Sequence, residues 1–236
     1  MEKNKIEIYV AAALFNARET FFNSTLVEKL EEKGYKANFP QRDGFEFSVL
    51  TEKIAKKFPE EKINPVVKNI IYFFDMGILI PKSDVILANF DEPLDAGVLV
   101  ETTYSNLIGK FIVGFRTDVR SPYGSLEDRF GGMHFFPAYQ TNHFIIQNIP
   151  SKKRDEGEKQ INLLVQKIDS AIKKSGVSHE ENLPAYVKQN PNVNKILEGA
   201  KLLFDGISNC SNNRLEQILE RYEKYEKILE KIGPKI

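Results

Sequence analysis

Three carboxylates lie close together within the segment from Ser83 to Gly114: Asp91, Asp95 and Glu101. Carboxylates in a binding site serve as general acids, general bases or nucleophiles. A carboxylate that is crowded by a second one has a raised pKa, which suits a general acid. These three side chains are therefore the first candidates for chemistry, provided that the fold brings them to one place.

The elements around them predict a strand–helix–strand unit. Residues 85–88 form a short apolar run typical of a strand buried on both faces. Residues 95–109 have a helical pattern, with Gly109 where a left-handed C-terminal cap belongs, and residues 111–113 read as the next strand. Because such a connection makes the strands parallel, their carboxyl ends meet at one edge, where open sheets bind ligands.

The N-terminal part predicts a second unit of the same kind. Residues 6–13 read as a strand, residues 18–33 as an amphipathic helix, and residues 35–39 as another strand. The turn-rich segment Pro40–Gly44 follows. The end of the first strand, this turn and the acidic loop before Glu101 should then lie at the same sheet edge.

Further helices are predicted before and after the segment from Ser83 to Gly114. Residues 48–57 form a short helix, and Asn64 is the N-cap of an apolar helix that has Pro65 in its first turn and runs to about residue 80. The charged segment 151–159 is a break and the expected domain boundary. Residues 160–173 then form the last helix that packs on the sheet.

The tail from residue 182 to residue 236 is predicted to be helical, with segments at 193–204 and 213–231. The second segment carries an apolar stripe that packs within the chain or forms an oligomer contact. The stripe consists of Leu215, Ile218, Leu219, Tyr222, Tyr225 and Leu229.

The alternation of strands and helices predicts an α/β fold with a doubly wound, five-stranded parallel sheet, flavodoxin- or Rossmann-like, and a helical C-terminal extension. The catalytic α/β domain should span residues 1–175 and the extension residues 176–236. An antiparallel sheet, or strands within residues 182–236, would contradict this fold.

Composition excludes several classes of function. The 33 basic and 33 acidic residues balance, which argues against a surface for nucleic acid. Cys210 is the single cysteine, so an internal disulfide is excluded and a reducing, cytoplasmic setting is expected. We expect no signal peptide, membrane span or membrane partner. The scattered histidines and the missing phosphate-binding glycine loop predict no metal and no cofactor.

Five short motifs in order resemble the nucleoside 2-deoxyribosyltransferase family. Together they cover roughly residues 6–148, and each falls at a predicted sheet edge. They are Ile8-Tyr9-Val10-Ala11 with Phe15, Pro40-Gln41-Arg42-Asp43-Gly44, Asp95-Ala96-Gly97 with Glu101, Thr117-Asp118-Val119-Arg120, and Asn142-His143-Phe144. Two departures from the family pattern lie near Glu101. Ala96 and Val98 replace two hydroxyl residues, and residues 102–105 are bulkier than the family's Gly-x-Ala.

The resemblance implies that the protein exchanges the base on a 2-deoxyribonucleoside, in nucleoside salvage, with Glu101 as the nucleophile that forms a glycosyl ester. From the residues alone, Glu101 at a helix start is also explained as a carboxylate that complements the helix dipole. Asp95 and Asp91 would hold sugar hydroxyls or protonate the departing base, and Asp95 is equally suited to cap the helix. Asp84 contacts the base or forms a turn.

The remaining site residues also follow from the resemblance. Tyr9 would hydrogen-bond the nucleophile and Phe15 would stack on the base, although Tyr9 also fits the core and Phe15 the start of the first helix. Gln41 and Asp43 would read base edges or hold a turn. Asn142 resembles a residue that the family supplies from a neighbouring subunit, which implies a homo-oligomer with shared active sites, at least a dimer.

Three functions remain open from the sequence. The leading one is a deoxyribosyltransferase with small-molecule deoxynucleosides and free nucleobases as partners. The second is a deoxynucleoside 5′-monophosphate N-glycosidase, for which Arg42, Arg116 and Arg120 would supply a phosphate pocket. The third is a catalytically silent nucleoside-binding module. The sequence leaves open whether purines alone or pyrimidines too are accepted.

Overall fold

The computed structural model describes residues 5–45, 47–180, 182–207 and 212–234. Cys210, on which the redox argument rests, lies outside the described residues. The chain divides into two compact units. The first contains residues 1–39 and 82–183, and the second contains residues 40–81 and 184–236.

The first unit is built on a five-stranded sheet in the order β2-β1-β3-β4-β5, and every neighbouring pair is parallel. The strands are β1 (Glu7–Ala11), β2 (Lys36–Asn38), β3 (Val85–Asn89), β4 (Phe111–Arg116) and β5 (His143–Ile146). The predicted doubly wound parallel sheet is thereby confirmed. The order reverses between β1 and β3, which places a switch point between the two strand–helix–strand units.

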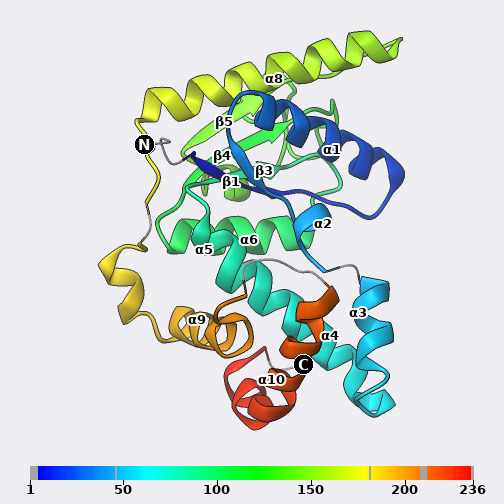
Figure 1. Cartoon of the computed structure of the whole chain (residues 1–236). Helices are drawn as coiled ribbons and strands as arrows, with labels where there is room; N and C mark the ends of the chain where they lie inside the picture. The colour runs from blue at the N-terminus through cyan, green and yellow to red at the C-terminus, as the bar shows by residue number, and fades with distance from the viewer. Residues whose placement is uncertain (1–4, 46, 181, 208–211, 235–236) are drawn as a thin grey trace. The chain divides into compact units, whose positions relative to one another are not determined.

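Helices cover both faces of this sheet (Figure 1). One face packs against α1 (Ala17–Glu32) and α8 (Arg154–Ser175), and the other against α6 (Ala96–Leu107). The core between the sheet, α1 and α8 is aliphatic and aromatic and is closed to solvent. It includes Ile8, Val10, Leu26, Leu87, Val113, Phe115, Leu164 and Ile168.

The charged segment 151–159 is not a break, contrary to the sequence prediction. Helix α8 begins at Arg154, six residues before the predicted start, and the segment supplies its exposed first turns. Asp155 and Glu156 in the first turn complement the helix dipole, and Arg154 Nε pairs with the Glu158 carboxylate at 2.7 Å. The charged residues from Arg154 onward therefore form the solvent-exposed N-terminal end of α8.

The face toward α6 combines large and small side chains in register. Tyr9 pairs with Ile86 across β1 and β3, while Ala88 of β3 pairs with Gly114 of β4. A Cβ at Gly114 would lie 2.8 Å from the Phe90 ring, so only glycine fits beside that buried side chain.

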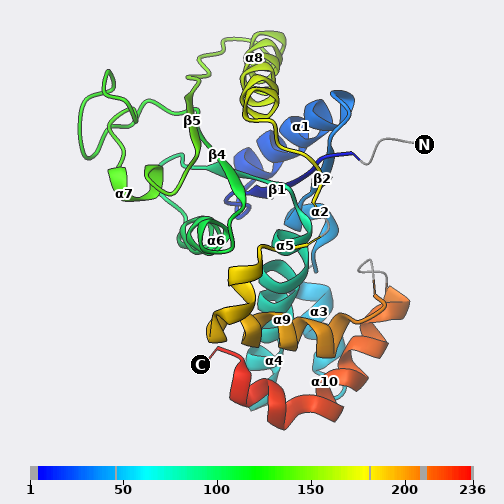
Figure 2. The ribbon, with the colours of Figure 1, turned by 90° about the vertical axis from the view of Figure 1, so that its left-hand side faces the viewer.

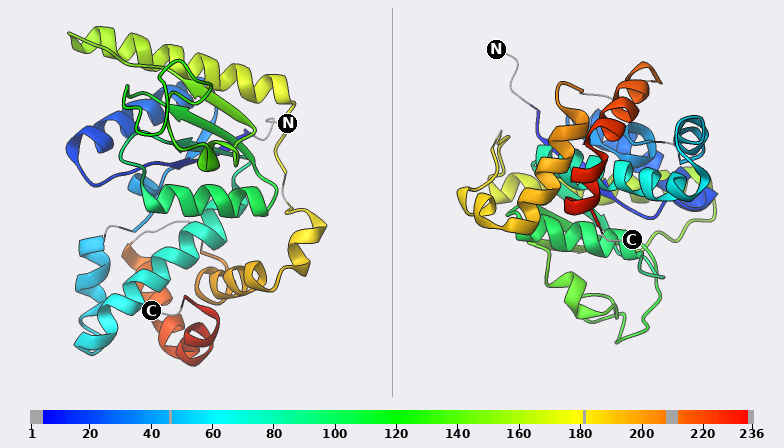
Figure 3. Two further views of the ribbon diagram at one scale, coloured as in Figure 1. Left: turned by 180° about the vertical axis from the view of Figure 1, so that it is seen from behind. Right: turned by 90° about the horizontal axis from the view of Figure 1, so that it is seen from below.

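The second unit is helical. It contains α2 (Pro40–Asp43), α3 (Phe47–Ile54), α4 (Glu60–Phe74), a π-helix (Asp75–Leu79), a 3-10 turn (Ala185–Gln189), α9 (Pro191–Phe204) and α10 (Asn212–Ile232). A further short helix, α5 (Ile80–Lys82), crosses the border between the units. Figure 3 shows α4, α9 and α10 in cyan, orange and red. No strand occurs in residues 182–207 or 212–234, as the sequence predicted.

Two local predictions in this unit were wrong. Residues 40–43 form a short helix, although the proline and the Asp-Gly pair indicated a turn. Asn64 is not an N-cap, because α4 begins at Glu60 and Pro65 lies inside it. The proline removes one backbone donor near the helix start. Burial of the apolar residues that follow, such as Val66 and Val67, stabilises the longer helix.

The helical stretch Glu60–Lys82 is long and apolar enough to cross a membrane by length and composition, which the sequence analysis did not expect. Its apolar side chains Val67, Ile70, Phe73 and Phe74 are buried among the helices of the second unit. This stretch is therefore the core helix of that unit.

The compact units differ from the two contiguous domains predicted from the sequence. The first unit continues past residue 175 to Leu183, and the second also contains residues 40–81, inserted between β2 and β3. Helix α4 of this insertion packs against α9. Hydrophobic periodicity locates such helices, but it does not show which of them share a core.

The apolar stripe of α10 packs within the chain, which decides between the two alternatives. Leu215, Ile218, Leu219, Tyr222 and Leu229 are buried. The Tyr222 ring meets Phe58 edge-on at 5.8 Å, and Asn69 Nδ2 donates to its hydroxyl at 2.8 Å.

Gly199→Ala is expected to destabilise the second unit by about 1–3 kcal/mol. The added methyl group would overlap the buried Phe73 ring, although alanine is normally the better helix former. Urea unfolding measures the effect. The matched control, Gly157→Ala in α8, meets only Ser151 at 3.3 Å and should change stability by less than about 1 kcal/mol. Equal effects of the two substitutions would contradict the packing of α9 against α4.

Candidate active site

A hollow of about 590 Å³ opens at the carboxyl edge of the sheet. The loops that follow β1, β3 and β4 and the first turn of α1 enclose it. Its lining is mostly polar and includes Asn16, Glu19, Asp91, Asp95, Thr117 and Asp118. The edge that parallel strands predict as a binding site is therefore hollowed and rich in carboxylates.

Asp95 lines this hollow and also caps α6. Its Oδ1 accepts a hydrogen bond from the Val98 backbone amide at 2.9 Å, which confirms the N-cap. A Cβ at Gly97 would lie 2.9 Å from that oxygen, so glycine gives the cap its room. Gly109 follows the helix at φ +77°, as the sequence predicted.

Asp91 joins the loop after β3 to the loop after β4. Its Oδ1 accepts from the backbone amides of Thr117 at 2.6 Å and Asp118 at 3.0 Å. Its Oδ2 accepts from the Thr117 hydroxyl at 2.6 Å. The carboxylate thus holds the two loops together, and its contact with a sugar hydroxyl stays a prediction.

Arg116, the last residue of β4, and Arg120, in the loop that follows, are both hydrogen-bonded within the protein. The guanidinium of Arg116 is buried and donates to Asp118, to the carbonyl of Gly131 at 2.8 Å and to the carbonyl of Arg120 at 2.6 Å. Arg120 donates to the Glu92 carbonyl and to Asp118. Both side chains fix the loops around the hollow.

Glu101 lies deeper along α6, against the centre of the sheet. The hydroxyl of Tyr9 donates to Glu101 Oε1 at 2.9 Å, across 92 residues of sequence. Tyr9 is fully buried in β1, which fixes the position of that donor. The pairing that the resemblance implied is therefore present in the structure.

The helix dipole is not the main influence on Glu101, contrary to the argument from the sequence. Glu101 is the sixth residue of α6, about 9 Å along the axis from the cap, and the dipole effect fades within the first turn. The hollow at the sheet edge is lined by Asp91 and Asp95, but Tyr9 and Glu101 are not part of its lining. The candidate site consequently has an edge part and an inner part along α6.

The bulkier residues after Glu101 direct their hydroxyls to the helix itself. Thr102 Oγ1 donates to the Val98 carbonyl at 2.7 Å, and Ser105 Oγ donates to the Glu101 carbonyl at 2.6 Å. Both side chains are buried. Thr103, which stands where the family has glycine, is exposed and donates to the Leu99 carbonyl at 2.9 Å, so the added hydroxyls are accommodated by hydrogen bonds to the backbone of α6.

Phe15 lies in the loop after β1 at the same edge, with 78% of its surface exposed. Its backbone amide donates to Glu19 Oε2 at 2.8 Å, while Asn16 caps α1 by accepting from the amides of Arg18 and Glu19. Phe15 therefore directly precedes the N-cap of α1, in agreement with its interpretation as the start of the first helix. Stacking of its ring on a base stays a prediction.

Asp84 and Asn142 lie at the opposite edge, because each directly precedes a strand. Asp84 is about 16 Å of strand away from the carboxyl end of β3. It accepts from the Glu7 and Glu180 amides at 2.8 and 2.9 Å and contacts His179 Nδ1 at 2.9 Å. The structure therefore assigns Asp84 to the turn and not to the base.

Asn142 holds the start of β4, where its Oδ1 accepts from the Ile112 amide at 2.8 Å. It is remote from the hollow of its own chain, so its role in a neighbouring site stays a prediction. Gln41 and Asp43 belong to the second unit, in which Arg42 Nε pairs with Asp43 at 2.9 Å. Their contacts with substrate also stay predictions.

Asp75 is a carboxyl group that the sequence analysis missed. It lies in the π-helix of the second unit, and burial raises its pKa from 3.8 to about 7. The signal was present, since Asp75 is the only charged residue between Lys68 and Lys82. A carboxyl group in such an apolar run, at a π-helix, is a candidate for function.

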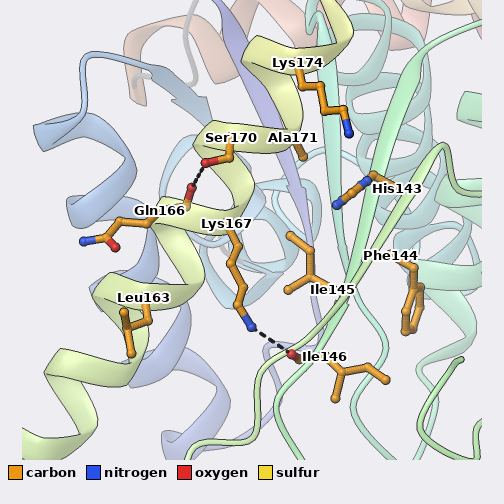
Figure 4. Close-up of a pocket in the computed structure, with 10 residues that line it drawn as sticks. All are labelled: His143, Phe144, Ile145, Ile146, Leu163, Gln166, Lys167, Ser170, Ala171 and Lys174. Atoms are coloured by element: carbon orange, nitrogen blue, oxygen red, sulfur yellow. Dashed lines mark hydrogen bonds between the residues drawn. The ribbon is translucent and has the colours of Figure 1, made fainter. Parts of the chain in front are cut away.

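A second hollow of about 590 Å³ lies between β5 and α8 (Figure 4). Lys167, Lys174 and His143 line it together with apolar side chains, and Lys167 Nζ donates to the Ile146 carbonyl at 3.3 Å. No carboxylate is part of its lining. The candidate acid, base and nucleophile groups are therefore not here.

The sequence model of the family described as nucleoside 2-deoxyribosyltransferase matches residues 8–177. The chain belongs to this family. Its members are enzymes that act on nucleosides, as transferases or N-glycosidases. The matched residues include the sheet except for Glu7 at the start of β1, and also α1, α6 and α8. A search of curated proteins gave no match.

Three solved structures are similar to this chain. A conserved protein from Enterococcus faecalis V583 is 17% identical, with a TM-score of 0.41, over 68% of this chain and 99% of that chain. The CMP N-glycosidase BcmB from Clostridium botulinum is 19% identical, with a TM-score of 0.38, over 70% and 98%. A 2-deoxyribosyltransferase from Bacillus psychrosaccharolyticus is 17% identical, with a TM-score of 0.38, over 59% and 85%.

Asp91→Asn is expected to lower the free energy of unfolding by about 2 kcal/mol. The amide group offers one acceptor oxygen where three donors from Thr117 and Asp118 now converge. Chemical denaturation followed by circular dichroism measures the loss. Asp155→Asn on the exposed start of α8 is the matched control and should change stability by less than about 0.5 kcal/mol. A neutral Asp91→Asn variant would show that the carboxylate does not hold the loops.

Asp75→Asn should stabilise the protein in alkaline solution but not in acid. The folded-state pKa of about 7 exceeds the ordinary 3.8, so the folded state binds the extra proton between these values. The free energy of unfolding of the wild type therefore falls as the pH rises from about 4 to about 7, and the asparagine variant lacks this fall. Denaturation at pH 5 and pH 8 tests it. The same difference between variant and wild type at both pH values would contradict the raised pKa of Asp75.

Proposed function

We propose that the protein is a deoxyribosyltransferase that exchanges the base of a 2-deoxyribonucleoside through a glycosyl ester on Glu101. The observation that carries the proposal is the 2.9 Å hydrogen bond from the Tyr9 hydroxyl to Glu101 Oε1. A buried tyrosine that holds one carboxylate oxygen fixes the orientation of the carboxylate for attack. Membership of the family supports this role for the pair.

The reaction has two displacement steps. Glu101 attacks the anomeric carbon, the bond from that carbon to the base nitrogen breaks, and the electron pair leaves with the base, which takes up a proton. A nitrogen of a second base then attacks the same carbon and loses its proton, and the ester bond breaks to restore the carboxylate. Two inversions give net retention. The missing 2-hydroxyl helps, because that electron-withdrawing group would destabilise the oxocarbenium-like transition state.

Asp95 is suited to hold the sugar at the entrance to this site. Its Oδ1 is used in capping α6, and within the described part of the chain its Oδ2 has no hydrogen-bond partner. An acceptor fixed by a helix cap is well positioned to receive a sugar hydroxyl. The cap and the substrate contact are thus compatible in one side chain.

The hydrolytic alternative, a 5′-monophosphate N-glycosidase, has one observation in its favour. Arg18 lies in the hollow at the start of α1 and has no ion pair among the described residues, whereas Arg120 of the same lining pairs with Asp118. Against it stands the charge of the lining. Five carboxylates, Glu19, Asp91, Glu92, Asp95 and Asp118, outnumber the guanidinium groups of Arg18 and Arg120. A dianionic phosphate is repelled there, so an uncharged nucleoside is the favoured substrate.

Product analysis separates the candidates. The enzyme is incubated with deoxyadenosine alone, with deoxyadenosine and a second free base, and with deoxyadenosine 5′-monophosphate. A new deoxynucleoside demonstrates transfer, whereas free sugar and base alone demonstrate hydrolysis. Cleavage of the monophosphate in preference to the nucleoside supports the glycosidase. If none of the three mixtures shows turnover, the result supports the catalytically silent nucleoside-binding module.

Glu101→Gln should lower activity by roughly 10³-fold or more, on the order of 4 kcal/mol in the barrier. The amide preserves the shape of the side chain but removes the nucleophilic charge. Mass spectrometry of protein quenched during turnover should detect the added deoxyribosyl group on Glu101. An adduct on another residue, or a variant within about tenfold of the wild type, would show the assignment to be wrong.

Tyr9→Phe and Asp95→Asn should have smaller effects than Glu101→Gln. The first removes one hydrogen bond to the nucleophile, which is expected to reduce kcat about 3- to 10-fold. The second weakens the contact with the sugar without abolishing the covalent ester. Quenched-flow detection of the ester in both variants is the measurement. Loss of the ester in Asp95→Asn would make Asp95 part of the first chemical step.

A further inference from the structure

The hollow between β5 and α8 (Figure 4), called the β5–α8 groove from here on, lies outside the candidate active site. Strand β5 is at the end of the strand order, so in the described part of the chain no strand pairs with its outer side. Figure 2 shows β5 at the edge of the first unit, with α8 beside it and α7 (Phe135–Ala138) beside α6 on the other face. The groove is therefore bounded by an open sheet edge and a helix.

The outer side of β5 offers backbone groups that the sheet does not use. The Asn142 amide donates to the Ile112 carbonyl at 2.9 Å, so it points toward β4. Because successive residues of a strand point their backbone groups to alternate sides, the amides of His143 and Ile145 point away from β4. Among the described residues, no backbone group of another element bonds to these two amides. An edge of this kind is a template for one further strand.

The groove has an apolar floor and cationic side chains above it. Ile145 and Ala171 are buried and form part of the floor. Lys167 and Lys174 are seven residues apart, which is about two turns, so they lie on one face of α8. In Figure 4 both lysine side chains and His143 extend into the space between the helix and the strand. No carboxylate belongs to the lining.

The two lysines of the groove are not neutralised within the described part of the chain. Lys173 of the same helix pairs with Asp169 at 2.8 Å, whereas neither Lys167 nor Lys174 has an ion pair among the described residues. Lys167 Nζ donates only to the Ile146 carbonyl, at 3.3 Å. Unpaired cations beside an apolar floor favour a ligand that carries carboxylates next to apolar groups.

We propose that the β5–α8 groove binds an extended acidic segment of a partner protein, which adds to β5 as a further strand. Backbone hydrogen bonds to the strand edge supply affinity, and the side chains that face α8 supply specificity. The stretch of α8 from Leu163 to Lys174 is about 16 Å long, which matches about five residues of extended chain. Carboxylates on the α8 side of that segment pair with Lys167 and Lys174.

A peptide fits this groove better than a single-stranded nucleic acid. The 33 basic and 33 acidic residues of the chain balance, so the protein as a whole does not attract a phosphate backbone. Bases also need aromatic rings on which to stack. The one phenyl ring among the lining residues is that of Phe144, and it stacks instead on the buried Phe90 ring at 6.1 Å.

Fluorescence anisotropy with a labelled peptide of about six residues, alternating valine and glutamate, tests the proposal. The peptide should bind the full chain with a dissociation constant of about 100 μM or lower, and added salt should weaken binding. Lys167→Glu and Lys174→Glu should each raise the dissociation constant about 10-fold or more. Lys159→Glu is the matched control, because it makes the same charge change on an exposed position of α8 outside the groove. It should change the constant by less than about twofold.

Amide hydrogen exchange tests the strand addition itself. Bound peptide should slow exchange at the His143 and Ile145 amides, and a peptide with proline at a central position should bind about 10-fold more weakly or worse. Binding without this protection overturns the proposal, as does no binding at about 1 mM peptide. Displacement by an equal concentration of succinate, which would indicate a site for small anions, also overturns it. So does tighter binding of a single-stranded RNA that Lys167→Glu weakens. The proposal does not depend on the proposed reaction, because the groove and the candidate active site share no residue.

Discussion

Parallel pairing of β1, β3 and β4 is the constraint on which the rest of the first unit depends. It places the loops after all three strands at one edge, and it obliges each connection to cross the sheet through a helix. Asp91 closes that edge by receiving three hydrogen bonds from Thr117 and Asp118. The buried guanidinium of Arg116 also holds the segment after β4, because it donates a hydrogen bond to the Gly131 carbonyl. The positions of Asp91 and Asp95 in the hollow are therefore fixed mainly by hydrogen bonds from backbone amides.

The same pairing also explains why the candidate site extends inward. Helix α6 must run back across the sheet, so Glu101 on its second turn comes to rest over Tyr9 in the middle of β1. Asp95 at the start of that helix remains at the edge. A single helix thus carries a sugar-binding candidate at its cap and a nucleophile candidate about 9 Å further along.

The second unit shows how an insertion and a tail combine into one core. Residues 40–81 lie between β2 and β3, within the residues that the family model matches, and residues 184–236 follow the match. Neither segment buries its apolar face alone. Gly199 allows the close approach of α9 to Phe73, and Tyr222 of α10 packs on Phe58. Asp75 is retained within this apolar setting with a raised pKa.

The sequence by itself predicted the parallel α/β sheet and a helix start at Asp95, because periodicity and capping chemistry are local signals. The pairing of Tyr9 with Glu101 was implied only by the family resemblance, since it joins residues 92 positions apart. The sequence did not predict the strand that begins at His143, so it could not place Asn142 at the far edge, and it left Asp84, directly before the predicted strand 85–88, open between a base contact and a turn. It also predicted the wrong starts for α4 and α8. In both helices, burial of later apolar residues stabilises a helix that begins before the N-cap or break indicated by the local sequence. Which helices share a core, and which side chains line the groove between β5 and α8, was decided by tertiary packing, because those contacts join residues that no sequence spacing relates.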